Sequence, residues 1–258
     1  MSAALDLTLG FAQPHGIVLI ALIFLVAFIY SSVGHGGASG YLAVLSFFAV
    51  PKAEMATSAL CLNLLVSGLA AYSFYKAGYF SWKLTWPFVW GSIPAALLGG
   101  LIKVSPVVYD RLLAFALVFA AIRLAFDFEH KTQFVYNPPS RIVALPVGGC
   151  IGLLSGIVGV GGGIFLSPVM ILLKWADPKT VAATSAFFIF VNSASGLLGR
   201  GLRGSFQITP SILFLLFTAL AGGFAGSKMG ARYFSALWLK RVLALVLGVA
   251  VVKLFVHS

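Results

Sequence analysis

Long apolar segments without charged residues run through much of the chain, and they restrict it to a helical membrane protein. The stretches 17–33 and 209–227, for example, contain no Lys, Arg, Asp or Glu. Strands of a membrane barrel would instead alternate apolar and polar residues. Only 9% of the 258 residues are charged, whereas a soluble protein of this size needs far more polar surface. We therefore predict an all-α integral membrane protein.

Ten apolar segments can be marked, five in each half of the chain. The most polar stretch, 127–141, lies between the halves and contains the pair Pro138-Pro139. We therefore divide the chain into a first membrane repeat at 1–130, a connecting loop at 131–141 and a second membrane repeat at 142–258. The predicted segments are 17–33, 38–50, 55–75, 84–101 and 109–126, followed by 142–158, 161–173, 180–199, 209–227 and 237–256.

The two halves share sequence patterns as well as hydropathy. Gly34 in the first half corresponds to Gly159 in the second, 125 positions later. The pair Thr57-Ser58 returns as Thr184-Ser185, 127 positions later. Matches in the same order with a slowly drifting offset indicate a duplicated unit.

The positions of the basic residues predict how the two copies lie in the membrane. When all ten segments cross, eleven of the 17 Lys and Arg residues share one side and six share the other. When the second segment of each half dips in and returns, the split becomes nine to eight, and the positive-inside bias disappears. We therefore predict a polytopic bundle of two inverted five-segment repeats, with both termini on the outer face. Segment 38–50 is shorter than the roughly 17–25 residues of a full span, so the glycine stretch before it is expected to lie at membrane depth.

A glycine-rich motif stands before the short second segment of each half. Glycines disfavour a helix, and a broken helix survives in lipid only where protein or a water-filled cavity satisfies the freed backbone groups. Free N–H groups at the start of a helix bind anions, and duplicated broken helices are typical of transporter binding sites. The alternative is that these glycines only allow close helix packing, as we expect for the stripes Gly148/Gly152/Gly156 and Gly222/Gly226/Gly230. The residues predicted to bind substrate here are Gly34, His35, Gly36 and Gly37 in the first half, and Gly159, Gly161, Gly162 and Gly163 in the second.

Hydroxyl and amide side chains near these motifs extend the predicted site. The hydroxyls of Thr57, Ser58, Thr184 and Ser185 can donate to an oxyanion, or bond back to a carbonyl of their own helix. Asn63 and Asn192 lie deeper in the same segments, where an amide needs either an interhelical partner or a ligand.

His35 is the one histidine inside an apolar region, and Val160 stands at the corresponding position of the second half. An imidazole there can donate to an anion, carry a proton, or be satisfied by a structural hydrogen bond.

The acids all lie at segment ends or in loops, so a mid-span carboxylate for proton relay is missing from the sequence. Exit of an anion driven by the membrane potential therefore fits the sequence better than proton coupling, and sodium coupling stays open.

Several other kinds of ligand are disfavoured. Cys61 and Cys150 fall within apolar segments, where we expect them to be small buried residues, and no metal set or cofactor is predicted. The basic residues stand singly between apolar segments, which indicates membrane anchoring and argues against nucleic-acid binding. The expected partners are a small anionic substrate and the lipid bilayer, and the sequence leaves the oligomeric state open.

A family resemblance is carried mainly by the second half. The pattern Gly156-x2-Gly159-Val-Gly-Gly-Gly163-Ile-Phe-Leu-x-Pro168, followed by Asp177-Pro-Lys-x2-Ala182-Ala-Thr184-Ser185, resembles the repeat signature of the sulfite exporter TauE/SafE family. The first-half copy is similar, but His35 and Ala38 replace the more usual small or apolar residue and glycine. The resemblance implies a multi-pass permease of the bacterial inner membrane for small sulfur-containing anions such as sulfite or sulfonates.

We therefore expect an exporter or facilitator for a small sulfur-containing anion, bound at the glycine motifs. An anion channel is the alternative. An intramembrane enzyme is less favoured because the segments show neither a His pair nor a carboxylate pair, and we expect that the protein is not an enzyme. The particular anion, the direction of flux and the coupling ion stay open.

Overall fold

The computed structural model describes residues 14–32, 34–48, 50, 52–125, 137–204 and 210–230, and all regular structure within these residues is α-helical. This confirms the predicted all-α class. The tenth predicted segment, 237–256, lies outside the described residues, as does most of the predicted connecting loop. The helices are α2 (Pro14–Ser32), α3 (Ala38–Phe47), α4 (Lys52–Lys76), α5 (Trp82–Leu101), α6 (Pro106–Ala125), α7 (Arg141–Val158), α8 (Gly163–Leu172), α9 (Pro178–Leu202) and α10 (Pro210–Gly230).

Five of the described helices are long and apolar enough to cross a membrane: α4, α5, α7, α9 and α10. In contrast, α3 and α8 have ten residues each. At about 1.5 Å per residue each is roughly 15 Å long, half of a hydrocarbon core of about 30 Å. The predicted short segments are therefore real structural elements. Arg141 begins α7, and Ser140 is its N-cap.

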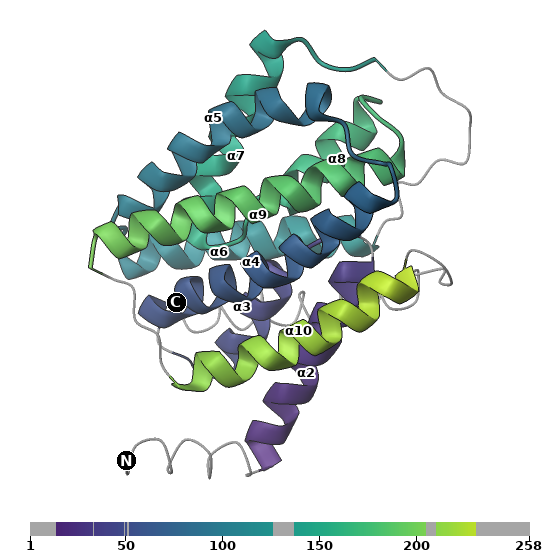
Figure 1. The fold of residues 1–258 in the computed structure, drawn as a ribbon. Coiled ribbons are helices and arrows are strands. Elements are labelled where there is room, and N and C mark those ends of the chain that lie inside the picture. Colours follow the sequence, from purple (N-terminus) through teal and green to yellow (C-terminus); the bar gives the residue numbers. More distant parts are fainter. Residues whose placement is uncertain are drawn as a thin grey trace.

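The centre of the bundle is the pair formed by α4 and α9 (Figure 1). Leu60 of α4 lies next to Gly196 of α9, and further along α4 Gly68 lies next to Phe190. Residue numbers rise on one helix as they fall on the other, so the two helices run antiparallel. Their N-terminal ends therefore lie at opposite ends of the bundle.

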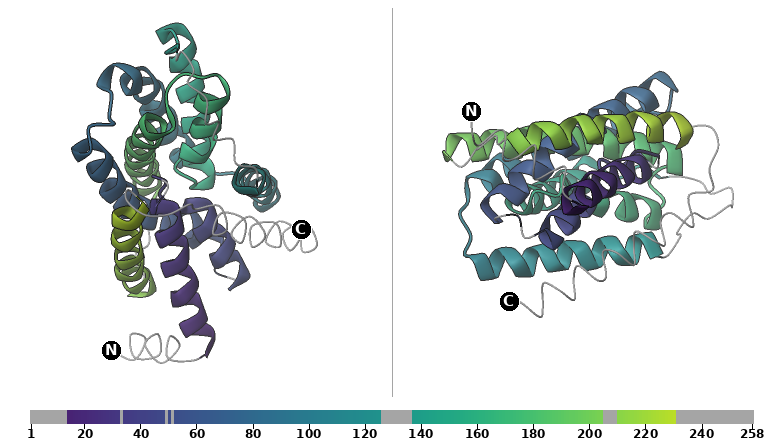
Figure 2. Two further views of the ribbon diagram at one scale, coloured as in Figure 1. Left: turned by 90° about the vertical axis from the view of Figure 1, so that its right-hand side faces the viewer. Right: turned by 90° about the horizontal axis from the view of Figure 1, so that it is seen from below.

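Two further helix pairs, α5 with α7 and α2 with α10, flank this centre on opposite sides (Figures 1 and 2). In the first pair Gly148 rests against the backbone of Phe88, and Gly156 rests against the carbonyl of Ala96. In the second pair Gly222 and Gly226 touch the carbonyls of Phe24 and Phe28. Both pairs are parallel, and the glycines allow the backbones to approach closely.

These contacts confirm tight packing as the role of the predicted glycine stripes at the described positions. They also explain a wrong prediction about Cys150. Its neighbours Gly148 and Gly152 face α5, so Cys150 points away from that contact and is exposed, while Cys61 is half-buried.

The stripe on α7 offers a matched pair of substitutions. We expect Gly148→Ala to destabilise the protein by about 1–3 kcal/mol, because the new methyl group would overlap the backbone of Phe88. Gly149→Ala should be neutral or stabilising, because among the described residues its methyl group would meet only the Gly91 carbonyl, at 3.6 Å, and alanine favours a helix. Thermal unfolding of the two purified variants in detergent measures the difference. Equal unfolding temperatures would contradict this account of the α5–α7 contact.

Candidate functional site

Both glycine motifs are breaks between two helices, and their backbone conformation requires glycine. Gly34 and Gly37 have φ values of 76° and 99°, between the end of α2 and the start of α3. Gly159, Gly161 and Gly162 have φ values of 89°, 76° and 81°, between α7 and α8. Residues with a Cβ rarely adopt this left-handed region. The two motifs therefore share a local structure as well as a sequence.

The two motifs meet at the middle of the α4–α9 pair. A methyl group on Gly36 would overlap the amide oxygen of Asn63, and one on Gly161 would overlap the amide nitrogen of the same side chain. Both glycines also lie against Ile189. Asn63 is close to the midpoint of α4 (Lys52–Lys76), and Ile189 is close to the midpoint of α9 (Pro178–Leu202). One motif from each half therefore contacts the same asparagine at the centre of the bundle.

Each motif approaches this centre from a different end. Gly34 lies next to Ala182, near the start of α9, whereas Gly159 lies next to Ala56, near the start of α4. Beyond the centre, α3 leads to α4 and α8 leads to α9. Because the starts of α4 and α9 lie at opposite ends, α3 and α8 diverge from the middle (Figure 1). A glycine stretch and its short helix thus run the length of the α4–α9 pair, which is the path that a full crossing requires.

The N-terminal ends of α3 and α8 offer free hydrogen-bond donors near the centre. Their N-caps are Gly37 and Gly162, and neither helix has a side-chain cap. The first N–H groups of a helix have no partner within it and carry the positive end of its dipole.

A buried hydroxyl without a partner lies beside each of these helix ends. The hydroxyl of Tyr41 is 3.0 Å from the position of a methyl group on Gly37, and the Ser155 side chain is 3.5 Å from the corresponding position on Gly162. Both residues are fully buried, and among the described residues neither hydroxyl has a hydrogen-bond partner. A buried polar group without a partner costs about 1–3 kcal/mol, so such groups usually meet a water or a ligand.

His35 joins the first motif to the second half of the chain. Its Nε2 lies 2.9 Å from Oγ of Ser167 in α8, and that Oγ lies 2.8 Å from Oγ of Ser185 in α9. Ser167 also donates to the carbonyl of Gly163 at 2.9 Å. Since a hydroxyl has one proton and two lone pairs, Ser167 then accepts from both His35 and Ser185. This cluster fixes the position of His35, whose ring is only partly buried.

Ser167 was absent from the predicted site. A signal was available in the sequence, because Ser167 is a polar residue in the short apolar segment that follows the second glycine motif. Its position four residues after Gly163 places it one helical turn further along α8.

Some polar groups of the other predicted residues bond to neighbouring helices, and some have no partner among the described residues. Thr184 and Ser185 bond to neighbouring helices rather than to their own: Thr85 donates to Thr184 at 3.2 Å, and Ser185 contacts Ser167. Asn63 donates to Ser193 at 3.1 Å. In the described part of the chain, no partner is found for three buried groups: the Thr57 hydroxyl, the amide oxygen of Asn63 and the whole amide of Asn192. Ser58 is buried beside Thr57 on α4.

No group of three or more possible metal ligands occurs in the described residues.

A family model described as sulfite exporter TauE/SafE matches residues 19–254, which include both glycine motifs. The chain belongs to this family. A relative, the probable membrane transporter protein y4hK of Sinorhizobium fredii, is 36% identical over 246 residues, which cover 94% of this chain and 99% of the relative. The sulfite exporter TauE/SafE family protein 1 of Arabidopsis thaliana is 29% identical over 112 residues, or 42% of this chain and 24% of that protein. No solved structure matches the chain.

The TauE/SafE assignment confirms the resemblance found in the sequence. Together with five helices of spanning length and composition, it identifies the chain as a multi-pass membrane transporter. The glycine motifs, the half-length helices and the buried polar groups beside them are the features of this TauE/SafE chain that a substrate site would use.

The contact between the second motif and Asn63 can be tested by a double-mutant cycle. Gly161→Ala should be more destabilising than Gly78→Ala, because both positions have similar positive φ but only Gly161 faces a neighbouring side chain. We expect Asn63→Ala in the same chain to recover part of the Gly161→Ala loss, with a coupling of about 0.5–3 kcal/mol. Thermal or denaturant unfolding of the four forms measures this coupling. Strict additivity would contradict the contact.

Proposed function

We propose that the protein carries a small sulfur-containing oxyanion, such as sulfite or an organosulfonate, across a bacterial inner membrane as an exporter or facilitator. The anion binds between the two glycine motifs. The observation that carries this proposal is the meeting of the two motifs at Asn63, with the N-terminal ends of α3 and α8 close by. The family description and the name of the Arabidopsis relative, both of which refer to sulfite export, support the substrate class.

The chemistry of the motifs suits an oxyanion. Several oxygen atoms on one small ligand can each accept a hydrogen bond from a helix N–H group or from a hydroxyl such as that of Tyr41 or Thr57. Two helix ends contribute positive partial charge from opposite directions, while glycine lets the ligand approach the backbone. We assign to this site the substrate-binding residues predicted from the sequence, with Tyr41 added, and we assign to Ser167 the positioning of His35.

The arrangement of the helices supports two inverted repeats. The pairing of α5 with α7 has its counterpart in the pairing of α10 with α2, and α4 pairs with its own counterpart α9. The α4–α9 pair is antiparallel, as two copies with opposite orientations in the membrane require. We therefore propose that residues 1–130 and 142–258 are related by a pseudo-two-fold axis that passes between Asn63 and Ile189, in the membrane plane.

The positions of the carboxylates in the described helices favour movement of the anion down the electrical gradient rather than coupling to protons. Glu54 is in the first turn of α4, Asp110 is near the start of α6, and Asp177 is the N-cap of α9. In the described residues, no carboxylate lies mid-helix to relay a proton. An inside-negative potential favours exit of a monovalent anion by about 2.3 kcal/mol per 100 mV.

The carrier function is tested with purified protein in liposomes loaded with sulfite. We expect efflux that saturates with sulfite concentration, accelerates when the lumen is made negative, and exchanges with sulfite added outside. Liposomes containing the Gly161→Leu variant should show only the background leak, because its side chain would fill the space next to Asn63. Flux that rises linearly with concentration would identify an anion channel and contradict the carrier.

The orphan hydroxyl of Tyr41 provides a test of the binding site. Tyr41→Phe should leave thermal stability unchanged or higher without ligand, because it removes a buried hydroxyl that has no partner among the described residues. The same variant should bind sulfite about tenfold more weakly, because a hydrogen bond to a charged ligand is lost. Sulfite-dependent shifts of the unfolding temperature measure both effects, and Tyr72→Phe, at an exposed ring, is the control. Unchanged sulfite binding by Tyr41→Phe would remove Tyr41 from the site.

A further inference from the structure

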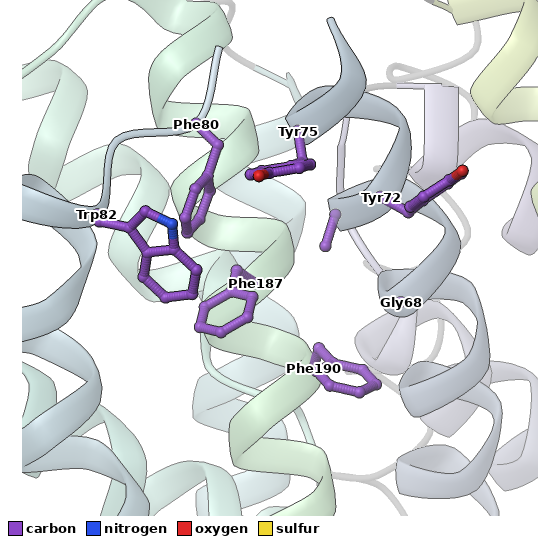
Figure 3. Close-up of a pocket in the computed structure, with 8 residues that line it drawn as sticks. Gly68, Tyr72, Tyr75, Phe80, Trp82, Phe187 and Phe190 are labelled. Carbon is purple, nitrogen blue, oxygen red and sulfur yellow. The ribbon is translucent and has the colours of Figure 1, made fainter. Parts of the chain in front are cut away.

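An aromatic groove opens on the outside of the bundle between α4 and α9. Its volume is about 300 Å³. Figure 3 shows that its walls come from three segments: the C-terminal half of α4, the turn at 80–82 that leads into α5, and the middle of α9. The lining residues are Gly68, Ala71, Tyr72, Tyr75, Phe80, Trp82, Phe187 and Phe190.

The rings of the groove form one continuous apolar surface. Phe80 lies 4.8 Å from Trp82 and 5.3 Å from Phe187 between ring centroids, both edge to face. Phe187 continues the surface to Phe190 at 6.5 Å. Gly68 provides the depth at this end, because it leaves room beside the Phe190 ring. The exposed faces of Tyr75 and Trp82 show that the groove is open to the surroundings of the bundle.

Three lysines stand at one end of this groove. The ammonium of Lys76 lies 5.0 Å from the centroid of the Tyr72 ring. The ammonium of Lys179 lies 2.9 Å from the Tyr79 hydroxyl, one residue before Phe80. Lys83 follows Trp82 directly and is exposed.

The end of the groove where Lys76, Lys83 and Lys179 lie, its rim, stays positively charged although a carboxylate is nearby. Asp177 accepts hydrogen bonds from the backbone N–H groups of Lys179 and Thr180, so its charge is used to cap α9. With three lysines and one capping aspartate, the rim among the described residues carries a net positive charge.

The length of the groove matches one leaflet of a bilayer. From Lys179 to Phe190 along α9 is about 16 Å, and from Lys76 to Gly68 along α4 is about 12 Å, at 1.5 Å per residue. Half of a hydrocarbon core is about 15 Å. The lysines lie at helix ends, where such side chains reach lipid headgroups, and the rings of Phe187 and Phe190 lie deeper along α9.

We propose that this groove binds an anionic phospholipid, with one acyl chain along the aromatic rings and the phosphate at Lys76, Lys83 and Lys179. The charge of the rim selects an anionic headgroup, and the apolar depth selects a chain rather than a free anion. The site lies on the outer side of α9 at the level where Ser185 and Ile189 contact the glycine motifs. It does not depend on the identity of the transported substrate.

Headgroup selection is tested by adding phosphatidylglycerol or phosphatidylcholine to the purified full chain in a neutral detergent, and by counting bound lipids with native mass spectrometry. We expect the unmodified protein to retain phosphatidylglycerol with about a tenfold preference, which corresponds to roughly 1.4 kcal/mol. The combined variant Lys76→Gln, Lys83→Gln and Lys179→Gln should bind the two lipids equally. The control variant Lys103→Gln, Lys174→Gln and Lys228→Gln removes the same charge elsewhere and should keep the preference. No preference in the unmodified protein, or a preference that survives the first triple substitution, would overturn the proposal.

The acyl-chain part is tested by filling the groove. Ala71→Trp should abolish retention of phosphatidylglycerol, whereas Trp90→Phe, at an exposed ring outside the groove, should not. Unfolding of lipid-free Ala71→Trp checks that the fold is intact. If that variant does not fold, Ala71→Leu gives a smaller block and a partial loss of retained lipid is expected. Retention unchanged in a folded groove-filling variant, or displacement of the lipid by toluenesulfonate, would overturn the proposal.

Discussion

The main constraint on this structure is that two interrupted helices must be stable inside an apolar bundle. A break exposes N–H and C=O groups that lipid cannot satisfy, so the unwound backbone must be enclosed by protein. The enclosure is tightest at Asn63, where Gly36 and Gly161 from the two halves both approach the same amide so closely that neither position has room for a methyl group. This contact brings the two breaks to one level and directs α3 and α8 away from each other.

The two halves are similar in path but differ in chemistry at the centre. His35 is held by Ser167, and Ser167 is in turn held by Ser185, so one side of the centre is polar. Val160, at the position corresponding to His35, is a buried apolar residue. A duplicated framework with different side chains on its two sides can present different surfaces to a ligand from the two sides of the membrane. In this chain the first motif supplies the imidazole, and the second half supplies the hydroxyls that orient it.

Close backbone packing and buried polar groups have separate roles in this bundle. Glycines on α7 and α10 bring whole helices together, and their contacts are with backbone carbonyls of α5 and α2. The polar side chains lie instead around the α4–α9 pair, where Thr57, Asn63 and Asn192 have buried atoms with no partner among the described residues. Helix packing in lipid gains little from burying apolar surface, because lipid tails are equally apolar. Small residues therefore stabilise the periphery, while the buried polar groups are concentrated around the α4–α9 pair.

Hydropathy and the repeated motifs were sufficient to predict the helical class, the positions of the described segments and the family. These properties are local, because apolar length and the need for glycine at positive φ act on a few consecutive residues. The sequence could not show that Gly36 and Gly161 share Asn63, that Ser167 supports His35, or that Cys150 is exposed. Each of these depends on which face of one helix meets another, and the distances along the chain are large compared with any local pattern. The tertiary structure alone decided them. Packing between the two halves brings Gly161 to Asn63 and Ser167 to His35, and the packing of α7 against α5 leaves Cys150 exposed.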